Sequence, residues 1–486
     1  MKIILMGEPM GLFMANETGS LSEVNPFTAS IAGAEYNVAV GLARLGHTPA
    51  YCTRLGFDPL GERILNGMRK NAIATDLVMQ TESAQTGFMM KGFTQKGDPD
   101  IAYYRKGSAA SQISTHDIDG LDLSGCEWLH VTGIFPAVSP SALAASLDGT
   151  RVPVEVYHNL ISTVRANLDK MHRYVRLRKK LLGVDELHMY DVYAPMVSGI
   201  DAKIPYEEAK ETVYQAVAPL GREYQAIIRE GLDNRWIDVY ENVGKRSGGY
   251  MSGSMVHPYI LLNYQDDLDG MFTLAHELGH AVHSYLSNKT QPTVYRDYVI
   301  FVAEVASTCN EALLMEHLLK TTTDKRRRAW LINHFLEQFK GTLYRQTMFA
   351  EFELRMGELS AQGETLTADL LSREYRALNE AYFGPDMVSD DQIALEWSRI
   401  PHFYYNYYVF QYATGYSAAI ALSRRILQEG EPAVKDYLEF LSGGCSKDPI
   451  DLLKGAGVDM ASPEPIQAAL DLFDTLLDEM EQLMED

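Results

Sequence analysis

The chain has 486 residues, of which 46% are hydrophobic and 22% are charged. These proportions are close to the average of globular proteins, so they exclude a chain that is disordered throughout and allow about two to four domains. Lysine and arginine number 43 against 65 aspartates and glutamates, which leaves a net charge of −22. That charge repels phosphate groups and excludes nucleic acid and anionic membranes as partners unless a basic patch overrides it.

Three further features bear on partners and compartment. The densest basic clusters, Arg176–Lys180 and Lys325–Arg328, hold four basic residues each, and we interpret them as solvated helix faces rather than binding patches. The four cysteines stand far apart, without the spacing of a disulfide framework or a thiolate zinc site. No apolar run reaches the length of a signal-peptide core or a membrane span. We therefore expect a cytoplasmic protein with no membrane or nucleic-acid partner, and the composition leaves its oligomeric state open.

The first 140 residues alternate short apolar runs with helical periodicity. This pattern predicts strands and helices in the order Lys2–Met6 (strand), Glu35–Leu45 (helix, closed by Gly46), Thr48–Arg54 (strand), Glu62–Asn71 (helix) and Trp128–Thr132 (strand). Such an alternation is typical of an α/β layer with a largely parallel sheet.

From about Ser141 onward, long amphipathic helices with many aromatic residues replace this pattern. The best strand candidates are Trp236–Tyr240 and Tyr259–Asn263, so we expect a mainly helical domain with a small sheet. Ser462–Leu470 is predicted as a helix, with Ser462 as N-cap and proline at its first position. Residues 471–486 then carry seven acidic side chains and no basic one, which we interpret as a solvated helix face.

The strongest chemical signal is the run HELGH at residues 276–280. On a helix, His276 and His280 lie one turn apart on one face, where both imidazoles can reach one zinc ion. Glu277 lies beside the metal rather than on it, a position suited to a general base that takes a proton from water. The apolar surroundings predict that the helix at residues 271–286 is buried. Because buried polar groups are costly, we favour a metal site over a core helix with two satisfied histidines.

A catalytic zinc site needs a third protein ligand. One candidate is His283 on the same helix. The other is a carboxylate from the apolar helix predicted at Tyr298–Lys320, where Glu304 and Glu311 lie seven residues apart on one face. Spacing alone does not choose between these candidates. The glutamate in the apolar run around residue 304 is otherwise unexplained, so we favour Glu304 as the ligand and Glu311 as a residue that supports the ligands. His283 would then either contact a ligand from behind or belong to the core.

Aromatic side chains are concentrated in Pro401–Ser417. Most of them fit a packed core helix, but several tyrosines cannot all bury their hydroxyl groups without partners. Phenol and imidazole donors beside a zinc site could stabilise the oxyanion of a tetrahedral intermediate. His402 is therefore a candidate for this role, together with Tyr407 or Tyr408.

Four segments of the second half resemble oligoendopeptidase F, of the thimet-type zinc metallopeptidases. They are HELGHAVH, FVAEVASTCNE, RSGGYMSGS followed by HPYILLNY, and IPHFYYNYYVFQYATGYS. The resemblance covers about Leu143 to Asp486. It implies a peptidase that cleaves oligopeptides in a channel between two helical lobes, which excludes folded proteins.

The same resemblance assigns roles to individual residues. It implies that zinc is bound by His276, His280 and Glu304, that Glu277 is the base, and that His402 and Tyr407 stabilise the intermediate. It also implies that the strand near Tyr259–Asn263 holds the substrate by backbone pairing, as strand addition does in general.

The first 140 residues are similar to a different family, the ribokinase-like sugar kinases, and most closely to 2-keto-3-deoxygluconate kinase. The similarity rests on GAEYNVAVGLARLG, GFDPLGERI and YYRKGSAAS. It implies that a sugar acid would contact Gly33, Asn37, Tyr103 and Arg105. The catalytic Asp-Thr-x-Gly-Ala-Gly-Asp loop of that family has no match, and KGAGVD at Lys454–Asp459 is interpreted as a turn of the peptidase half. The sugar contacts would therefore be vestigial.

Taken together, the patterns predict a mixed fold. We expect an α/β ribokinase-like fragment without its catalytic half at residues 1–140, and a mainly α-helical zincin domain with a small β-sheet at residues 141–486, without the N-terminal helical lobe of its relatives. The expected function of this chimera is that of a zinc metalloendopeptidase that cleaves oligopeptides, with one Zn²⁺ per chain and activity impaired by the missing lobe. An inactive zinc- or sugar-binding fusion is the alternative, and the absent loop disfavours 2-keto-3-deoxygluconate kinase.

Overall fold

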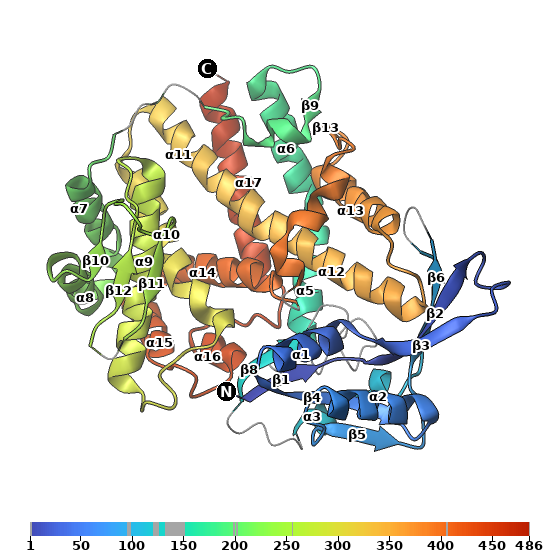
Figure 1. Cartoon of the computed structure of the whole chain (residues 1–486). Helices are drawn as coiled ribbons and strands as arrows, with labels where there is room; N and C mark the ends of the chain where they lie inside the picture. The colour runs from blue at the N-terminus through green and yellow to red at the C-terminus, as the bar shows by residue number, and fades with distance from the viewer. Residues whose placement is uncertain are drawn as a thin grey trace. The chain divides into compact units, whose positions relative to one another are not determined.

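The chain forms two compact units (Figure 1). The computed structural model describes residues 2–94, 99–119, 126–131, 151–197, 200, 203–254, 256–404 and 407–485. The first unit comprises Met1–Gly149, Ala350–Leu378 and Asp391–Tyr408, and the second comprises Thr150–Phe349, Asn379–Asp390 and Val409–Asp486. The predicted domain boundary near Pro140 lies outside the described residues.

A four-stranded parallel sheet forms the centre of the first unit. Its strand order is β5-β4-β1-β8, and every adjacent pair is parallel. The strands are β1 (Lys2–Met6), β4 (Thr48–Gly56), β5 (Val78–Thr81) and β8 (Cys126–Val131), with helices α1 (Ala34–Arg44), α2 (Pro59–Lys70), α3 (Thr115–Asp119) and η1 (Ala110–Gln112). The predicted α/β layer is therefore confirmed, although Thr132, the last residue of one predicted strand, lies outside the described residues.

The alternation of side chains along β1 explains how the sheet is covered. Successive residues of a strand point to opposite faces. Ile3 and Leu5 pack with buried residues of α1 and α2, whereas Ile4 and Met6 pack on the other face with Ala110 of η1. Both faces of β1 are therefore buried, which explains why its sequence is continuously apolar rather than alternating.

A second sheet in this unit was not predicted. Its order is β3-β2-β6-β7, with β2 antiparallel to β3 and parallel to β6, and β6 antiparallel to β7. The strands are β2 (Met10–Thr18), β3 (Phe27–Ala32), β6 (Phe88–Phe93) and β7 (Ile101–Tyr104). Many of their side chains are only partly buried, so these segments lack the continuous apolar runs that indicated the parallel sheet.

The second unit is mainly helical. Its elements, with α12 and α13 shared at the unit boundary, are α5 (Val154–Arg165), α6 (Leu168–Leu182), β9 (Leu187–His188), η3 (Met189–Tyr193), α7 (Tyr206–Ala216), η4 (Ala218–Leu220), α8 (Gly221–Asp233), β10 (Ile237–Asp238), β11 (Tyr250–Ser252), β12 (Tyr259–Leu261), α9 (Leu268–Thr290), α10 (Ile300–Thr321), α11 (Lys325–Gln338), the π-helical turn η5 (Phe339–Tyr344), α12 (Arg345–Gln362), α13 (Ala368–Phe383), β13 (Met387–Val388), α14 (Phe410–Glu429), α15 (Glu431–Leu441), α16 (Pro449–Gly455) and α17 (Glu464–Met484). The remaining helical turns, η6 (Ile393–Arg399) and η7 (Pro401–Tyr404), belong to the first unit. The two predicted strands are present as β10 and β12, each shorter than expected.

Helix α10 lies at the centre of the second unit. It packs against both α9 and α14 (Figure 1), and apolar residues occur around its whole circumference. A helix that is hydrophobic on all sides is normally buried. A carboxylate on the buried faces of α10, such as Glu304 or Glu311, therefore needs a partner from a neighbouring helix.

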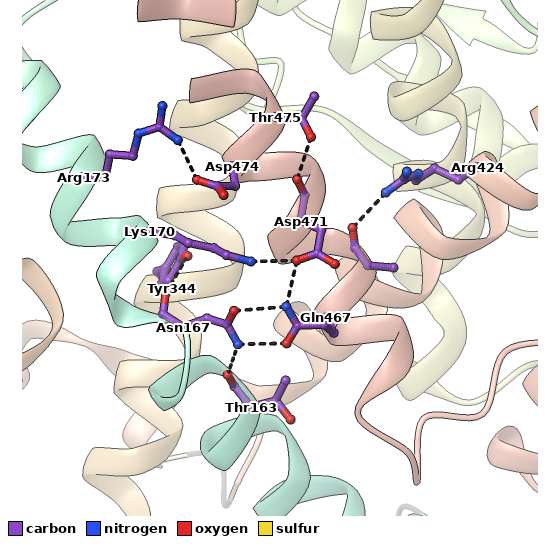
Figure 2. Close-up of polar contacts among 11 residues, drawn as sticks. Thr163, Asn167, Lys170, Arg173, Tyr344, Arg424, Gln467, Asp471, Asp474 and Thr475 are labelled. Atoms are coloured by element: carbon purple, nitrogen blue, oxygen red, sulfur yellow. Dashed lines mark hydrogen bonds and ion pairs between the residues drawn. The ribbon is translucent and has the colours of Figure 1, made fainter. Parts of the chain in front are cut away.

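The acidic C-terminal segment is a partly solvated helix face, as predicted, but it also pairs with another helix, which the sequence did not indicate. It forms the second part of one long helix, α17, whose acidic side chains meet basic side chains of α6 (Figure 2). Arg173 contacts Asp474 at 2.8 Å and Asp478 at 2.7 Å, and Lys170 contacts Asp471 at 2.7 Å. The acidity of α17 is thus partly neutralised within the unit.

The same helix pair is joined by a reciprocal amide contact. Asn167 and Gln467 each donate one side-chain hydrogen bond to the other, at 2.9 and 3.0 Å (Figure 2).

Helix α17 begins at Glu464 with Pro463 at its N-cap, so the predicted start at Pro463, after a Ser462 cap, was one residue early.

The basic cluster Arg176–Lys180 is also not a purely solvated face. Arg178 is only 1% exposed, and its guanidinium donates to Glu337 at 2.7 Å and to the main-chain oxygens of Asp191 and Ala194. Arg328 of the second basic cluster pairs with Glu479 of α17. Both clusters therefore join helices within the unit.

The helices also bear on membrane insertion. Within the described part of the chain, none of them combines the length and the apolar character that a bilayer crossing requires.

Replacing Arg178 should destabilise the second unit far more than replacing Arg173. We expect Arg178→Met to lower the free energy of unfolding by about 3–5 kcal/mol, because it removes a buried guanidinium that donates to Glu337 and to the main-chain oxygens of Asp191 and Ala194. Arg173→Gln breaks partly exposed ion pairs and should cost about 1 kcal/mol or less. Denaturant unfolding followed by circular dichroism measures both, and equal losses would contradict the burial argument.

Candidate metal centre

The predicted metal-binding helix is α9, which extends beyond the predicted residues 271–286 to Leu268–Thr290. Its N-cap is Asp267, whose side chain accepts a hydrogen bond from the main-chain N–H of Gly270 at 2.8 Å. This cap compensates an N–H that has no partner within the helix. Helix α9 therefore continues without interruption through both histidines, with its first turn stabilised by the cap.

Gly279 allows α9 to approach α10 closely. A Cβ atom at this position would lie 2.6 Å from the main-chain oxygen of Ala306 and from the Cα of Ser307. Real Cβ atoms do not tolerate such contacts with backbone, so only glycine permits this helix spacing. The contact lies between His276 and His280 on one helix and close to Glu304 on the other.

This approach brings three predicted ligands together. The Nε2 atoms of His276 and His280 are 3.1 Å apart, and the Oε2 of Glu304 lies 3.3 Å from the first and 3.6 Å from the second. Ligand atoms about 2.0–2.1 Å from a tetrahedral zinc ion lie about 3.3 Å apart. The triangle of two nitrogens and one oxygen therefore has the size and the donor set that Zn²⁺ requires, and its side chains are 13–29% exposed.

Two further side chains support His276 from behind. Its Nδ1 contacts the Oε1 of Glu311 at 2.5 Å, and the Oε2 of Glu311 accepts a hydrogen bond from Gln338 at 2.7 Å. A donor hydrogen at Nδ1 leaves Nε2 free to bind a metal, so this contact selects the metal-binding tautomer. Gln338 was missed because it is the last residue of α11, before a π-helical turn, and no motif marks it.

A buried polar network holds the same helices together. Asn310 donates to the main-chain oxygen of Ala275 at 3.1 Å and accepts a hydrogen bond from the hydroxyl of Tyr224 at 2.8 Å. Asn310 and Ala275 immediately precede Glu311 and His276 in the chain. The network therefore fixes the backbone on both sides of the imidazole–carboxylate contact.

Burial and charge act in opposite directions on these groups. Burial disfavours the charged form of His276, but hydrogen bonds and attraction from Glu304 and Glu311 outweigh it and raise its pKa well above the usual value. Burial tends to raise the pKa of Glu304, yet His276 and His280 lower it to about 2. Burial and the neighbouring His276 lower the pKa of His280 to about 4. An ionised Glu304 is thus paired with two imidazoles.

Glu277 differs from the ligands in its surroundings. It is 5% exposed, its Oε2 has no hydrogen-bond partner among the described residues, and burial raises its pKa to about 7. The carboxylate also contacts the main chain of Met251 in β11. A buried carboxylate oxygen without a partner is costly unless a substrate or water uses it.

His283 does not join the metal-binding group. It is 1% exposed and stacks on Tyr298, with ring centroids 3.7 Å apart and planes within 3° of parallel. Burial lowers its pKa to about 3. Its position fits a neutral core residue and not a third ligand.

The aromatic segment was expected to form one packed helix, and this expectation was wrong. It contains η7 (Pro401–Tyr404) and the first part of α14, and Tyr407 between them has a positive φ of 48°. The main-chain N–H of Tyr407 donates to the buried Glu353 at 3.2 Å, which stabilises this unusual conformation.

His402 and Tyr407 both belong to the first unit, and their catalytic role stays a prediction. Tyr407 is 2% exposed, whereas Tyr408 is partly exposed and its ring stacks on His402 with centroids 5.7 Å apart. Of the two phenols considered, Tyr408 is therefore the one that accompanies the imidazole.

One further tyrosine lies on a helix of the same unit as the ligands. Gly415 of α14 lies against Glu304, since a Cβ there would be 3.5 Å from the Cβ of Glu304. Tyr412 precedes Gly415 by three residues, on the same side of α14, and is partly exposed. This tyrosine belongs to the aromatic segment, but no signal in the sequence separated it from its aromatic neighbours.

The small sheet corrects the predicted substrate strand. Its order is β10-β12-β11, so β12 (Tyr259–Leu261) is the central strand and pairs with neighbours on both sides. A central strand has no free edge for a substrate. The edge strand that lies over α9 is β11. Its neighbour Gly249 approaches Glu277 closely, since a Cβ atom on this glycine would lie 3.5 Å from the Oε1 of Glu277.

Comparison with known proteins identifies the family of the helical unit. Residues 139–472 match peptidase family M3. The chain belongs to this family. It is 56% identical to oligopeptidase PepF of Bacillus subtilis over 345 residues, which are 71% of this chain and 52% of that protein. It is 45% identical to an oligoendopeptidase F homolog of Lactococcus lactis over 71% of this chain and 57% of that protein.

A solved M3 structure is also similar. The crystal structure of oligoendopeptidase F from Enterococcus faecium is 42% identical, covers 71% of this chain and 55% of that chain, and has a TM-score of 0.57. The present chain spans about half the length of the curated M3 relatives that it matches. The predicted resemblance to oligoendopeptidase F is confirmed.

Residues 2–150 match the pfkB family of carbohydrate kinases, which confirms the second resemblance. The predicted sugar contacts lie in the first unit. Arg105 is buried and paired with Glu8, at 2.7 Å from Nε to Oε2, and Tyr103 lies near its guanidinium. Gly33, with φ 141°, borders Glu8, and Asn37 is exposed. The guanidinium of Arg105 is thus already paired with the carboxylate of Glu8, which argues against a contact between Arg105 and a sugar acid.

Gly279→Ala tests the close helix contact of the M3 domain. We expect a loss of about 1–3 kcal/mol in the free energy of unfolding, because the added methyl group meets backbone atoms of α10, and at least a roughly tenfold weaker zinc affinity. Gly341→Ala is the control, since no described atom lies within 4 Å of its Cβ position. Denaturant unfolding and competition with a zinc chelator measure both effects, and identical behaviour of the two variants would contradict the prediction.

The support of His276 predicts a graded loss of zinc affinity. Glu311→Ala should weaken zinc binding by about 10- to 100-fold, because the imidazole loses the partner that orients it. Gln338→Met should cause a smaller loss, since it only releases Glu311. Glu316→Ala, on the same helix, should retain the affinity of the unchanged chain. Chelator competition on the purified proteins measures all three, and a larger loss in Glu316→Ala than in Glu311→Ala would reject the assignment.

Proposed function

We propose that this M3 chain is a zinc-dependent metalloendopeptidase that hydrolyses internal bonds of oligopeptides. The observation that supports the proposal most strongly is the convergence of His276, His280 and Glu304 beside a buried glutamate with a free oxygen. Three protein ligands leave a fourth position of a tetrahedral ion for water or substrate, as catalytic zinc sites do.

The ligands would hold one Zn²⁺, which when bound acts as a Lewis acid and makes water more acidic. Glu277 would accept a proton from the attacking water and pass it to the leaving amine. Its buried Oε2, which has no hydrogen-bond partner among the described residues, favours this role. Glu311 and Gln338 would keep the imidazole of His276 in its orientation throughout.

We propose that the free edge of β11 holds the substrate backbone. Main-chain N–H and C=O groups of an edge strand bind an extended peptide without regard to its side chains. Because β11 contacts Glu277 through Met251, a peptide paired with this edge would lie near the general base. This replaces β12 as the proposed substrate strand.

Donors for the oxyanion are proposed in the aromatic segment. His402 with Tyr407 or Tyr408 remains the predicted pair, and the stacking of Tyr408 on His402 favours the second phenol. Tyr412 is a further candidate because its helix packs on Glu304 through Gly415. Hydrogen-bond donors of this kind typically contribute about 10²- to 10³-fold to the rate.

The four cysteines are free, and two of them are buried. Free thiols are typical of a reducing compartment, so we place this activity in the cytoplasm.

Glu277→Gln tests the proposed activity. We expect about 10²- to 10⁴-fold slower hydrolysis of a quenched fluorescent oligopeptide, because the amide cannot accept a proton, while zinc content stays at one ion per chain. Glu223→Gln, an exposed position on α8, serves as the control and should retain full activity. Undiminished zinc-dependent cleavage by Glu277→Gln would reject the proposed role.

A further inference from the structure

The face of α9 that carries the metal ligands continues toward its C-terminus. After His276 and His280, the next residues at a spacing of four are Ser284 and Asn288. Both line a small pocket of about 50 Å³, together with Gly253, Ser254, Arg296, Asp297 and Tyr298. A pocket of this size can hold a few atoms, such as a carboxylate group. It is separate from the three metal ligands but begins only one helical turn away from His280.

Arg296 is the cation of this pocket. Its Nε and Nη1 atoms are buried and have no hydrogen-bond partner among the residues that the structure describes. Within the same residues, the only carboxylate paired with it is that of Asp297, 3.8 Å from Nε and 90% exposed. Buried donors of a charged group without partners are costly, so natural structures normally satisfy them with a ligand, an ion or water.

The other polar groups of the pocket are held in place. The hydroxyl groups of Ser284 and Tyr298 are 3.1 Å apart, and Asn288 donates to the main-chain oxygen of Ser254 at 3.1 Å. The residue before Arg296 is anchored as well, since the main-chain oxygen of Tyr295 accepts a hydrogen bond from Cys445 at 2.8 Å. The pocket is thus pre-organised, and little order needs to be created when a ligand binds.

Its position suits a peptide that occupies the proposed active site. Ser284 and Asn288 lie about 6 and 12 Å along α9 from His280, at a rise of about 1.5 Å per residue. An extended peptide advances about 3.3 Å per residue, so the pocket is about two to four residues from the scissile bond. Ser254 also follows closely on the proposed substrate edge β11 in the sequence.

We propose that this pocket is a carboxylate-binding subsite, in which Arg296 binds an acidic side chain or the C-terminal carboxylate of the peptide two to four residues from the cleaved bond. The inference rests on the proposed function. A fork of N–H donors matches the two oxygens of a carboxylate. A local cation also offsets the repulsion that a chain of net charge −22 exerts on acidic peptides.

The first experiment measures kcat/KM for matched quenched peptides. One series carries glutamate or glutamine at each of the four positions on either side of the cleaved bond, and a second series ends in a free carboxylate or an amide. We expect the unchanged chain to prefer one acidic peptide by about 10- to 100-fold over its amide counterpart, as charge-assisted hydrogen bonds typically do. The position of the preference identifies the source of the carboxylate, and no preference in either series overturns the proposal.

Variants then assign the preference to Arg296. Arg296→Gln should abolish it while retaining hydrolysis of the neutral peptides, and Arg296→Lys should retain part of it because the charge remains without the fork. Arg229→Gln, whose guanidinium pairs with Glu211 on α7, is the matched control and should retain the full preference. An equal loss on acidic and neutral peptides, or a preference unchanged in Arg296→Gln, would overturn the assignment.

Binding without turnover separates this proposal from the proposed function. In the Glu277→Gln background, fluorescence anisotropy measures the Kd of the preferred acidic peptide and of its amide counterpart, with and without Arg296→Gln. An acid preference that requires Arg296 supports the subsite even if no peptide is cleaved by the unchanged chain. If peptides are cleaved but bind without regard to charge, only the subsite is rejected.

Discussion

The close approach of α9 and α10 at Gly279 is the constraint on which the metal centre depends. A side chain at this position would collide with the backbone of Ala306 and Ser307, and the helices would have to separate. Because His276 and His280 lie on one helix and Glu304 on the other, any separation would enlarge the triangle of ligand atoms. A donor spacing near about 3.3 Å, which tetrahedral zinc requires, is therefore a property of helix packing as much as of the ligands.

The charged side chains near the core of the second unit are stabilised by partners from neighbouring helices. Glu304 lies on a helix that is apolar on all sides, and two imidazoles partner it. Glu311 and Gln338 satisfy the far side of His276, and Asn310 satisfies the backbone of α9. Glu277 and Arg296 differ, since within the described part of the chain each retains buried polar atoms without a partner. Both flank the region in which the proposed substrate would lie, where a ligand could supply the missing partners.

The distribution of charge shows what interpretation from sequence leaves out. A run of acidic residues and two basic clusters looked like solvated helix faces. In the structure, the acids of α17 pair with Arg173 and Lys170 of α6, and Arg178 is buried against Glu337. Local charge patterns do not indicate which helices will pack together. The pairing of Arg105 with Glu8 likewise shows that a residue inherited from a kinase-like pattern can take an internal partner.

The sequence by itself determined the parallel α/β layer and the helix with both histidines, and it gave the grounds for proposing Glu277 as the base and Glu304 as the third ligand, because periodicity and ligand spacing are local properties. It could not determine that β11 rather than β12 is the free edge, that the aromatic segment breaks at Tyr407, or that Gln338 and Arg296 lie beside the site. These features depend on contacts between segments far apart in the chain. Only the tertiary structure decided them, because packing, and not local pattern, sets which polar groups meet and which remain without partners.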